Sequence, residues 1–261
     1  MSRILHAIEE TPWLSTPSAL RMVLDIANRD TDIEAVAAKL GRPLDNTRSV
    51  EMRGDIAVIP VTGTIVRYSS FFTDICGGVS TEMLARDLKT ALEDESVKTI
   101  VFNIDSPGGE ASGIAELSEM IFEARKEKTI VAYVDDMAAS AGYWIASAAS
   151  AIYASKTAMV GSIGVVFTLG EKTGSGIEIV SNVSPRKRPD VSTDEGISQI
   201  QGWADTLGEI FVDSVAVNRG VSSDTVLEKF GQGDMLIGRE ALEAGMVDSI
   251  TTFEALIAKL T

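Results

Sequence analysis

Ser140 lies in a run of small residues, MAASAGY at 137–143, between a β-rich segment and a helical one. A serine at the turn from a strand to a helix has its hydroxyl raised from the sheet edge, where it can attack a carbonyl as a nucleophile. The backbone N–H of Ala141 can point at the same carbonyl and stabilise the charge that forms on its oxygen. The alternative is that Ser140 only caps the helix and that its small neighbours permit close packing.

A second candidate feature is the turn DSPGG at 105–109, which also stands between a strand and a helix. Its two glycines allow the backbone to approach a ligand closely and to direct N–H groups at it. Such donors can hold a developing oxyanion. The alternative is an ordinary turn, because Pro and Gly are common in strand-to-helix connections.

A serine nucleophile needs a base, and the only histidine of the chain, His6, lies near the N-terminus. An amine can serve instead where burial and neighbouring cations lower its pKa from about 10.4 toward about 7 to 8. Lys187 is the candidate, because Arg186 and Arg188 do not deprotonate and their charges favour a neutral amine. Ser162, in the run VGSIGV, can accept a hydrogen bond from this lysine or relay its proton. The alternative is that the basic triplet is a solvated loop.

The composition excludes several classes of function. The 261 residues include 23 Lys and Arg against 38 Asp and Glu, which gives a net charge of -15. So acidic a chain repels polyphosphate, and we expect neither a nucleic acid nor an anionic membrane as its partner. One Cys and one His allow no disulfide framework and no Cys- or His-rich metal site, so we expect no metal and no cofactor. With no signal peptide and no run of about 20 apolar residues, we expect no membrane anchor and a cytoplasmic protein.

The elements that must position these residues alternate between helical and β-rich patterns. Residues 1–40 have helical spacing and 42–54 are polar, so we expect an N-terminal helical extension with a connector over 1–53 and a second domain over 54–261. In the second domain the pattern predicts strands at 56–62, 99–104, 129–134, 152–154, 163–166 and 246–250. It predicts helices at 81–92, 115–126, 139–149, 193–218 and 223–230, with the segment 238–244 and a terminal helix closing the chain. Repeated βα units of this kind predict a parallel α/β sheet whose loops collect at one edge.

The order of these motifs resembles the signal peptide peptidase A family of serine proteases. The shared pattern is DSPGG, a helix, a strand, AASAGY, VGSIGV and then a lysine motif, here SPRKRPD at 184–190, and it covers about residues 54–250. The short chain, the N-terminal helical extension and SPRKRPD look like the bacteriophage branch, the capsid assembly (minor capsid protein C-like) proteases. Segment 238–248 matches the closing helix and strand of the family.

The resemblance implies a ClpP/crotonase-like α/β fold of repeated βα units and a Ser-Lys dyad. Ser140 then corresponds to the nucleophile, and Lys187 to the general base that later protonates the leaving amine. Ser162 corresponds to the group that orients the lysine, and Gly109 with Ala141 to the oxyanion hole. A strict count along the family motif falls one residue later, on an arginine that cannot act as the base, so Lys187 is retained.

These expectations favour a serine endopeptidase that cleaves a polypeptide, by analogy a capsid or scaffold protein during phage or prophage head maturation, in the host cytoplasm or the procapsid. Relatives build their sites in rings, so we expect a homo-oligomer. Three alternatives remain open: a general peptide-degrading peptidase of the same family, an acyl-CoA enzyme of the crotonase type, and an inactive structural member of a head-assembly complex. The acyl-CoA alternative leaves Ser140 and Lys187 without a role and finds no site for CoA phosphates on an acidic chain.

Overall fold

The structure is a computed structural model that describes residues 13–15, 50–69, 78–168 and 183–261. The expected N-terminal helical extension falls almost wholly outside these ranges, so the extension and the division at residues 53 and 54 stay predictions. Within the described ranges no helix is both long and apolar enough to span a membrane.

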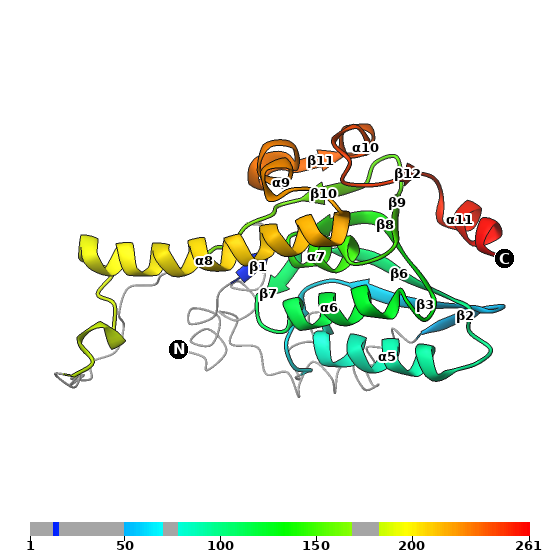
Figure 1. Cartoon of the computed structure of the whole chain (residues 1–261), viewed down its shortest axis with the longest axis horizontal. Coiled ribbons are helices and arrows are strands. Elements are labelled where there is room, and N and C mark those ends of the chain that lie inside the picture. Colours follow the sequence, from blue (N-terminus) through cyan, green and yellow to red (C-terminus); the bar gives the residue numbers. More distant parts are fainter. Residues whose placement is uncertain (1–12, 16–49, 70–77, 169–182) are drawn as a thin grey trace, which may run out of the picture.

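A mostly parallel sheet forms the centre of the chain (Figure 1). Its strands lie in the order β11-β10-β8-β6-β3-β2, and β9 with β12 extends it beside β8. The central strands β3 (Ile56–Thr62), β6 (Thr99–Ser106) and β8 (Thr129–Ala139) pair in parallel. The outer strands are β2 (Glu51–Arg53), β9 (Ala151–Ala154), β10 (Met159–Gly161), β11 (Met235–Ile237) and β12 (Ser249–Ile250). This is the α/β fold of repeated βα units that the sequence predicts.

A second, four-stranded sheet continues from the carboxyl ends of β3 and β6. Its order is β1-β7-β4-β5, with β1 (Trp13–Ser15), β4 (Ile65–Val66), β5 (Val79–Ser80) and β7 (Gly108–Glu110). The expected turn at 105–109 is therefore where the chain leaves the large sheet and enters the small one. Sequence patterning missed these strands because two or three residues are too few to show an alternation.

Helices cover both faces of the large sheet. The main core lies between one face and the helices α5 (Thr81–Glu93), α6 (Ile114–Ala124) and α7 (Ala141–Ser147). On the other face, Leu256 and Ile257 of α11 (Phe253–Leu260) pack with Val58 and Val101. The remaining helical segments are η1 (Pro185–Lys187), α8 (Asp194–Arg219), α9 (Ser223–Lys229), η2 (Gly231–Gly233) and α10 (Arg239–Ala244).

The strand expected at 163–166 is wrong. The strand in this part of the chain is β10, which ends at Gly161. The backbone φ is positive at Gly161 (138°), Ser162 (54°) and Gly164 (158°), so the chain cannot continue as a regular strand. The apolar residues that follow form no regular strand, although their composition is typical of one.

The long helix α8 has two different halves. In the carboxyl half, Phe211 and Val215 are fully buried in the main core. Toward the amino end Ile200 is buried, but Ile197, Trp203 and, next to Phe211, Ile210 are about half exposed, at 50%, 45% and 47%. The apolar face expected along the helix is real, but these three of its residues are only partly covered.

The carboxyl end of α8 is anchored by an ion pair. Arg219 makes two hydrogen bonds of 2.9 and 2.8 Å to the Asp248 carboxylate and a third, of 3.1 Å, to the Gly245 carbonyl. The same carboxylate accepts a hydrogen bond from the Ile152 N–H at 2.7 Å, so α8 is tied to the start of β9. Burial raises the pKa of the Asp248 carboxyl, but the hydrogen bonds from Arg219 and Ile152 lower it more, and its pKa lies below the ordinary value.

Replacing the carboxylate tests this anchor. We expect Asp248→Asn to lower the free energy of unfolding at pH 7 by about 1–2 kcal/mol, a modest loss because the Asp248 side chain is 41% exposed. A lowered folded-state pKa stabilises the protein above the unfolded pKa of about 3.9 and stops doing so as the pH falls through the folded value. Urea unfolding of both proteins between pH 7 and pH 3 should therefore show the difference shrinking at the acid end. The exposed Glu119→Gln is the control; a pH-independent difference for Asp248→Asn would contradict the assignment.

Candidate functional site

Ser140 links β8 to α7 in a strained conformation. Its φ is 53° and its ψ is -116°, a region that costs a residue with a side chain about 1–3 kcal/mol. Two backbone hydrogen bonds hold it there: its N–H donates to the Gly161 carbonyl at 2.7 Å, and its carbonyl accepts from the Trp144 N–H at 2.9 Å. A strained serine between a strand and a helix is typical of nucleophile turns in hydrolases.

The hydroxyl of Ser140 is buried and unsatisfied. The residue is 1% exposed, and its Oγ has no hydrogen-bond partner among the residues that the structure describes. It makes no capping bond to the N–H groups of α7, so the alternative in which Ser140 is only a helix cap is contradicted. A buried hydroxyl without a partner is destabilising by about 1–3 kcal/mol, and such groups call for a functional explanation.

An irregularity in β8 brings the chain to this turn. Ile104 pairs with Val134, but two residues later on β6 Ser106 pairs with Ala138, so β8 holds two extra residues between the pairs. Two exposed aspartates of β8 lie inside this bulge. Bulges re-aim the residues that follow them and are frequent beside active sites.

Packing and hydrogen bonding hold helix α7 in place, and with it the N–H of Ala141 at its start. All seven of its residues are buried. Trp144 stacks on Phe211 of α8 with ring centroids 4.4 Å apart, and the Tyr143 hydroxyl donates to the Met246 carbonyl at 3.0 Å. Burial raises the pKa of Tyr143, so this hydroxyl stays a donor. The first N–H groups of a helix have no acceptor within the helix, and the Ala141 N–H is one of them.

The glycines of β7 are required by the fold itself. A Cβ on Gly109 would stand 1.7 Å from the Ile65 carbonyl oxygen of β4. Gly108 has φ 96°, which favours glycine. Helix α7 contacts β7, and a Cβ on Gly142 would stand 3.2 Å from the Ser106 carbonyl oxygen. Strand β7 and the start of α7 therefore lie side by side.

Ser162 lies beside Ser140 at the end of the neighbouring strand. It directly follows Gly161, whose carbonyl accepts the Ser140 N–H, and its own N–H donates to the Asp234 carbonyl at 2.9 Å. A Cβ on Gly161 would stand 2.3 Å from the same Asp234 oxygen. Gly161 ends β10 directly before the positive-φ Ser162, and its glycine in the run VGSIGV is the sequence signal for this role.

The structure does not bring Lys187 to this site. Lys187 is exposed in η1, and the carbonyl of the neighbouring Arg186 accepts a hydrogen bond from Gln199, near the amino end of α8. Gln199 and Phe211, which carries the stack on α7, are separated by about 18 Å along the helix axis, at about 1.5 Å per residue. In Figure 1 the yellow-green segment that holds η1 lies at the amino end of α8, well away from α7.

A groove begins next to Ser162. It has a volume of about 650 Å³ and is formed by the segment 163–165, α8 and the start of α9. Its apolar lining includes Ile163, Val165, Val212 and Leu227, and its acidic lining includes Asp205 and Glu209.

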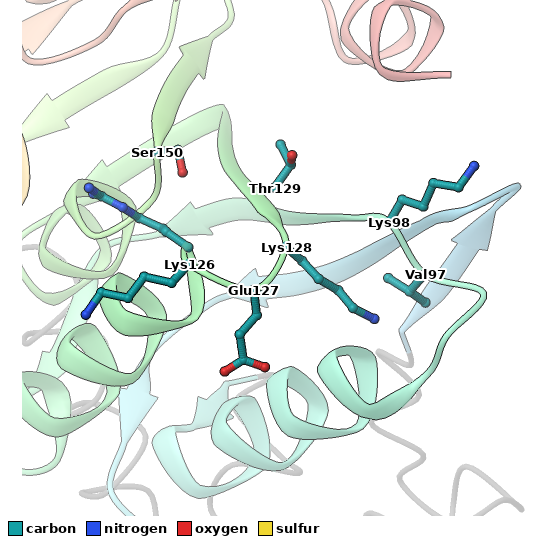
Figure 2. A pocket seen from close by; sticks show the side chains of 8 residues that line it. Val97, Lys98, Lys126, Glu127, Lys128, Thr129 and Ser150 are labelled. Carbon is teal, nitrogen blue, oxygen red and sulfur yellow. The ribbon is translucent and has the colours of Figure 1, made fainter.

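A cavity of about 630 Å³ lies at the opposite edge of the large sheet (Figure 2). It is lined at the amino ends of β6 and β8, whereas ligands of parallel α/β sheets bind at the carboxyl ends. The labelled side chains of Lys98, Lys126 and Lys128 point in different directions rather than toward one centre. Lys128 binds the carbonyls at the end of α5, at 2.9 and 2.6 Å, and Lys98 pairs with Asp55 at 2.8 Å. These cations hold the fold together.

Ser106 holds the turn between β6 and β7 and offers a test of the site's framework. Its buried hydroxyl donates to the Gly63 carbonyl at 2.7 Å and accepts the Gly108 N–H at 3.1 Å. We expect Ser106→Ala to cost about 1–3 kcal/mol of unfolding free energy, because two buried groups lose their partner. Hydrogen exchange at the Gly108 amide should accelerate.

The matched control is Ser118→Ala, also at a buried serine. Ser118 accepts one hydrogen bond from the Asn218 amide, at 3.0 Å, and this amide keeps a second acceptor in Ser147. The control should lose less stability and leave Gly108 exchange unchanged. Equal exchange at Gly108 in both variants would show that Ser106 does not hold the turn.

Several known proteins are similar to this chain in sequence. The profile of peptidase family S49 matches residues 123–261, more than half of the chain. The head-tail preconnector protein of Enterobacteria phage P21 is 30% identical over 204 residues, and capsid assembly protease C of Escherichia phage lambda is 29% identical over 212. The chloroplastic serine protease SPPA of Arabidopsis thaliana is 30% identical over 218 residues.

These alignments cover 75%, 78% and 79% of the present chain. The chain spans only 40%, 48% and 32% of the relatives' own lengths. The relatives include phage head proteins and signal peptide peptidase A proteins, as the sequence motifs predict, and the sheet and helices are those of the expected ClpP/crotonase-like α/β fold. The profile match, with the order of motifs on this fold, assigns the family: the chain belongs to peptidase family S49.

Proposed function

We propose that this chain is a serine endopeptidase in which Ser140 is the nucleophile. The observation that carries the proposal is the Ser140 hydroxyl, which is buried, has no partner among the described residues and is held in a strained turn between β8 and α7. Such a group lowers the stability of the folded protein, which is expected where a site is arranged for a reaction. Membership of a peptidase family supports peptide-bond hydrolysis as that reaction.

The reaction is acyl transfer to the serine and then to water. The Ser140 Oγ attacks the peptide carbonyl carbon while a base takes its proton, and the N–H groups of Ala141 and Gly109 hold the oxyanion. The C–N bond then breaks, and the protonated base returns its proton to the leaving amine. A water molecule, activated by the same base, hydrolyses the ester and restores Ser140.

Lys187 is the proposed base, with Ser162 orienting its amine, and a second copy of the chain is the proposed source of this amine. Within one chain, η1 sits at the amino end of α8, whereas Ser140 lies at α7, which packs on the carboxyl half of α8. Along α8, Ile197, Trp203 and Ile210 are also half exposed, a surface that a neighbouring copy can cover. A homo-oligomeric ring would bring the end of one α8 to the Ser140 of the next copy.

The proposed substrate is a polypeptide, in particular a capsid or scaffold protein of a phage or prophage head. This is supported by the names of two relatives, a head-tail preconnector protein and a capsid assembly protease. The groove beside Ser162 is lined by both apolar and acidic residues, which suits a segment that carries apolar and basic residues. A general peptide-degrading peptidase is the alternative, and cleavage of unrelated unfolded proteins at equal rates would favour it.

A fluorophosphonate probe tests the dyad. We expect the native protein to be labelled on one serine and Ser140→Ala to lose the label, because the probe reacts only with an activated serine. Lys187→Ala should lower the labelling rate and the peptidase kcat by about 100-fold or more, the usual contribution of a general base. Mass spectrometry of the labelled peptide gives the site.

Two variants control for general damage. Ser150→Ala removes an exposed serine, and Lys89→Ala removes an exposed lysine of α5, far along the chain from Lys187. Both should keep most of the labelling. Label that survives Ser140→Ala would rule out the nucleophile, and no label in the native protein at any pH would favour an inactive structural member of the family.

Mixing the two inactive variants tests the second copy. When Ser140→Ala and Lys187→Ala are mixed and allowed to exchange subunits, we expect activity to return, because random mixing gives one intact dyad in about four interfaces. Peptidase activity and labelling of the Lys187→Ala chain are the measurements.

The control mixture pairs each variant with the double variant Ser140→Ala/Lys187→Ala, which can complete no dyad of this kind. If subunits exchange and the first mixture stays as inactive as the control, the lysine does not act from a neighbouring copy.

A further inference from the structure

The outer edge of β7 is occupied by a segment from near the N-terminus. Strand β1 pairs antiparallel with β7, with Trp13 opposite Glu110, Leu14 opposite Gly109 and Ser15 opposite Gly108. The other edge of β7 pairs with β4, and β1 is the terminal strand of the small sheet. Without β1, β7 would itself be an edge strand. Figure 1 shows β1, in dark blue, beside β7 and far in sequence from it.

This edge lies next to Ser140. Ser106, two residues before β7 begins, pairs with Ala138, which is two residues before Ser140. Helix α7, which starts directly after Ser140, contacts β7. Ser15, the last residue of β1, lies opposite Gly108, the first residue of β7. Ser15 therefore covers the end of β7 that is nearest to Ser140.

A free strand edge is a binding site for an extended polypeptide. Its unpaired N–H and C=O groups accept an added strand whatever the side chains of that strand are. Two of the three β7 residues, Gly108 and Gly109, are glycines, so at these two positions no side chain lies beside an added strand. Strand β1 therefore uses the main-chain groups that a polypeptide beside Ser140 would use.

The burial of Ser140 points the same way. Ser140 is 1% exposed, so a polypeptide cannot reach its hydroxyl in the arrangement described, and an element must move first. Strand β1 is suited to leave, because it is three residues long and pairs with one strand only in the small sheet. Pro12 and Pro17 flank it in the sequence, and proline has no N–H to extend the pairing.

We propose that residues 13–15 are an internal competitor of the polypeptide substrate. In the arrangement described, β1 occupies the edge of β7 that the substrate must pair with, and substrate binds only after β1 has left. The inference rests on the proposed peptidase function, which supplies the substrate, but it concerns binding and is tested without catalysis.

Proline substitutions in β1 test the competition in the full-length chain. Along an antiparallel strand, N–H groups point alternately toward the partner strand and away from it. The N–H of Leu14 therefore points to one side of β1, and the N–H groups of Trp13 and Ser15 point to the other. Leu14→Pro removes the first set, and the double variant Trp13→Pro/Ser15→Pro removes the second. Only one of the two variants removes donors aimed at β7, and the other is its matched control. Both are made in the Ser140→Ala background, and the measurement is the Kd for fluorescent, unfolded casein.

We expect one proline variant to bind casein roughly tenfold more tightly than its parent, the gain when only about a tenth of the parent molecules have β7 free. The other variant should stay close to the parent. A synthetic peptide of residues 11–17 (TPWLSTP) should displace casein from the released variant, and a scrambled peptide should not. Unchanged casein affinity in both variants, or displacement by both peptides alike, would overturn the proposal.

Thermal unfolding separates a damaged fold from a negative result, because β1 lies at the sheet edge and its loss should leave the main transition in place. The two proposals can also fail separately. Absence of fluorophosphonate labelling in chains that keep Ser140 would remove the peptidase function while casein binding still reports on β1. Labelling with no effect of the prolines would remove only the internal competitor.

Discussion

A hydrogen bond from the Ser140 N–H to the Gly161 carbonyl, 2.7 Å long, joins the ends of β8 and β10 and holds Ser140 at positive φ. Such a conformation costs about 1–3 kcal/mol and persists only where the surroundings determine it fully. Here they do: the bulge in β8 delivers the chain to the turn, all of α7 is buried behind it, and Trp144 stacks on Phe211. The large sheet, helix α7 and the glycines of β7 and β10 together support this one serine.

The same packing divides α8 into an anchored half and a projecting half. The Arg219–Asp248 pair and the aromatic stack fix the carboxyl half to the body, while the amino half carries η1 and its basic residues outward. A rigid helix of 26 residues cannot fold back on the body, so the separation of Lys187 from Ser140 is a property of the chain's own geometry.

Much of the fold follows from the sequence, and the exceptions have physical causes. Alternating βα patterns predicted the central strands, α5 to α9 and the terminal helix to within a few residues. The pattern at 163–166 failed because positive φ angles at Gly161, Ser162 and Gly164 override a strand-like composition. The small sheet was missed because its strands are defined by pairing partners far along the chain rather than by their own residues. For the site, the sequence placed Ser140 at a strand-to-helix turn correctly. The position of Lys187 relative to Ser140 depends on how α8 projects from the body, which the spacing of residues along the chain does not give.

Helix α11 is synthesised long after the strands that it covers. Its Leu256 and Ile257 cover Val58 and Val101 on the face of the sheet opposite the main core. During synthesis at about 5–20 residues per second, β3 emerges on the order of 10–40 s before α11 does. For that interval the apolar back of the growing sheet has no cover from its own helix. Nascent chains are therefore most exposed to aggregation, and most in need of a chaperone, on the face of the sheet opposite the main core.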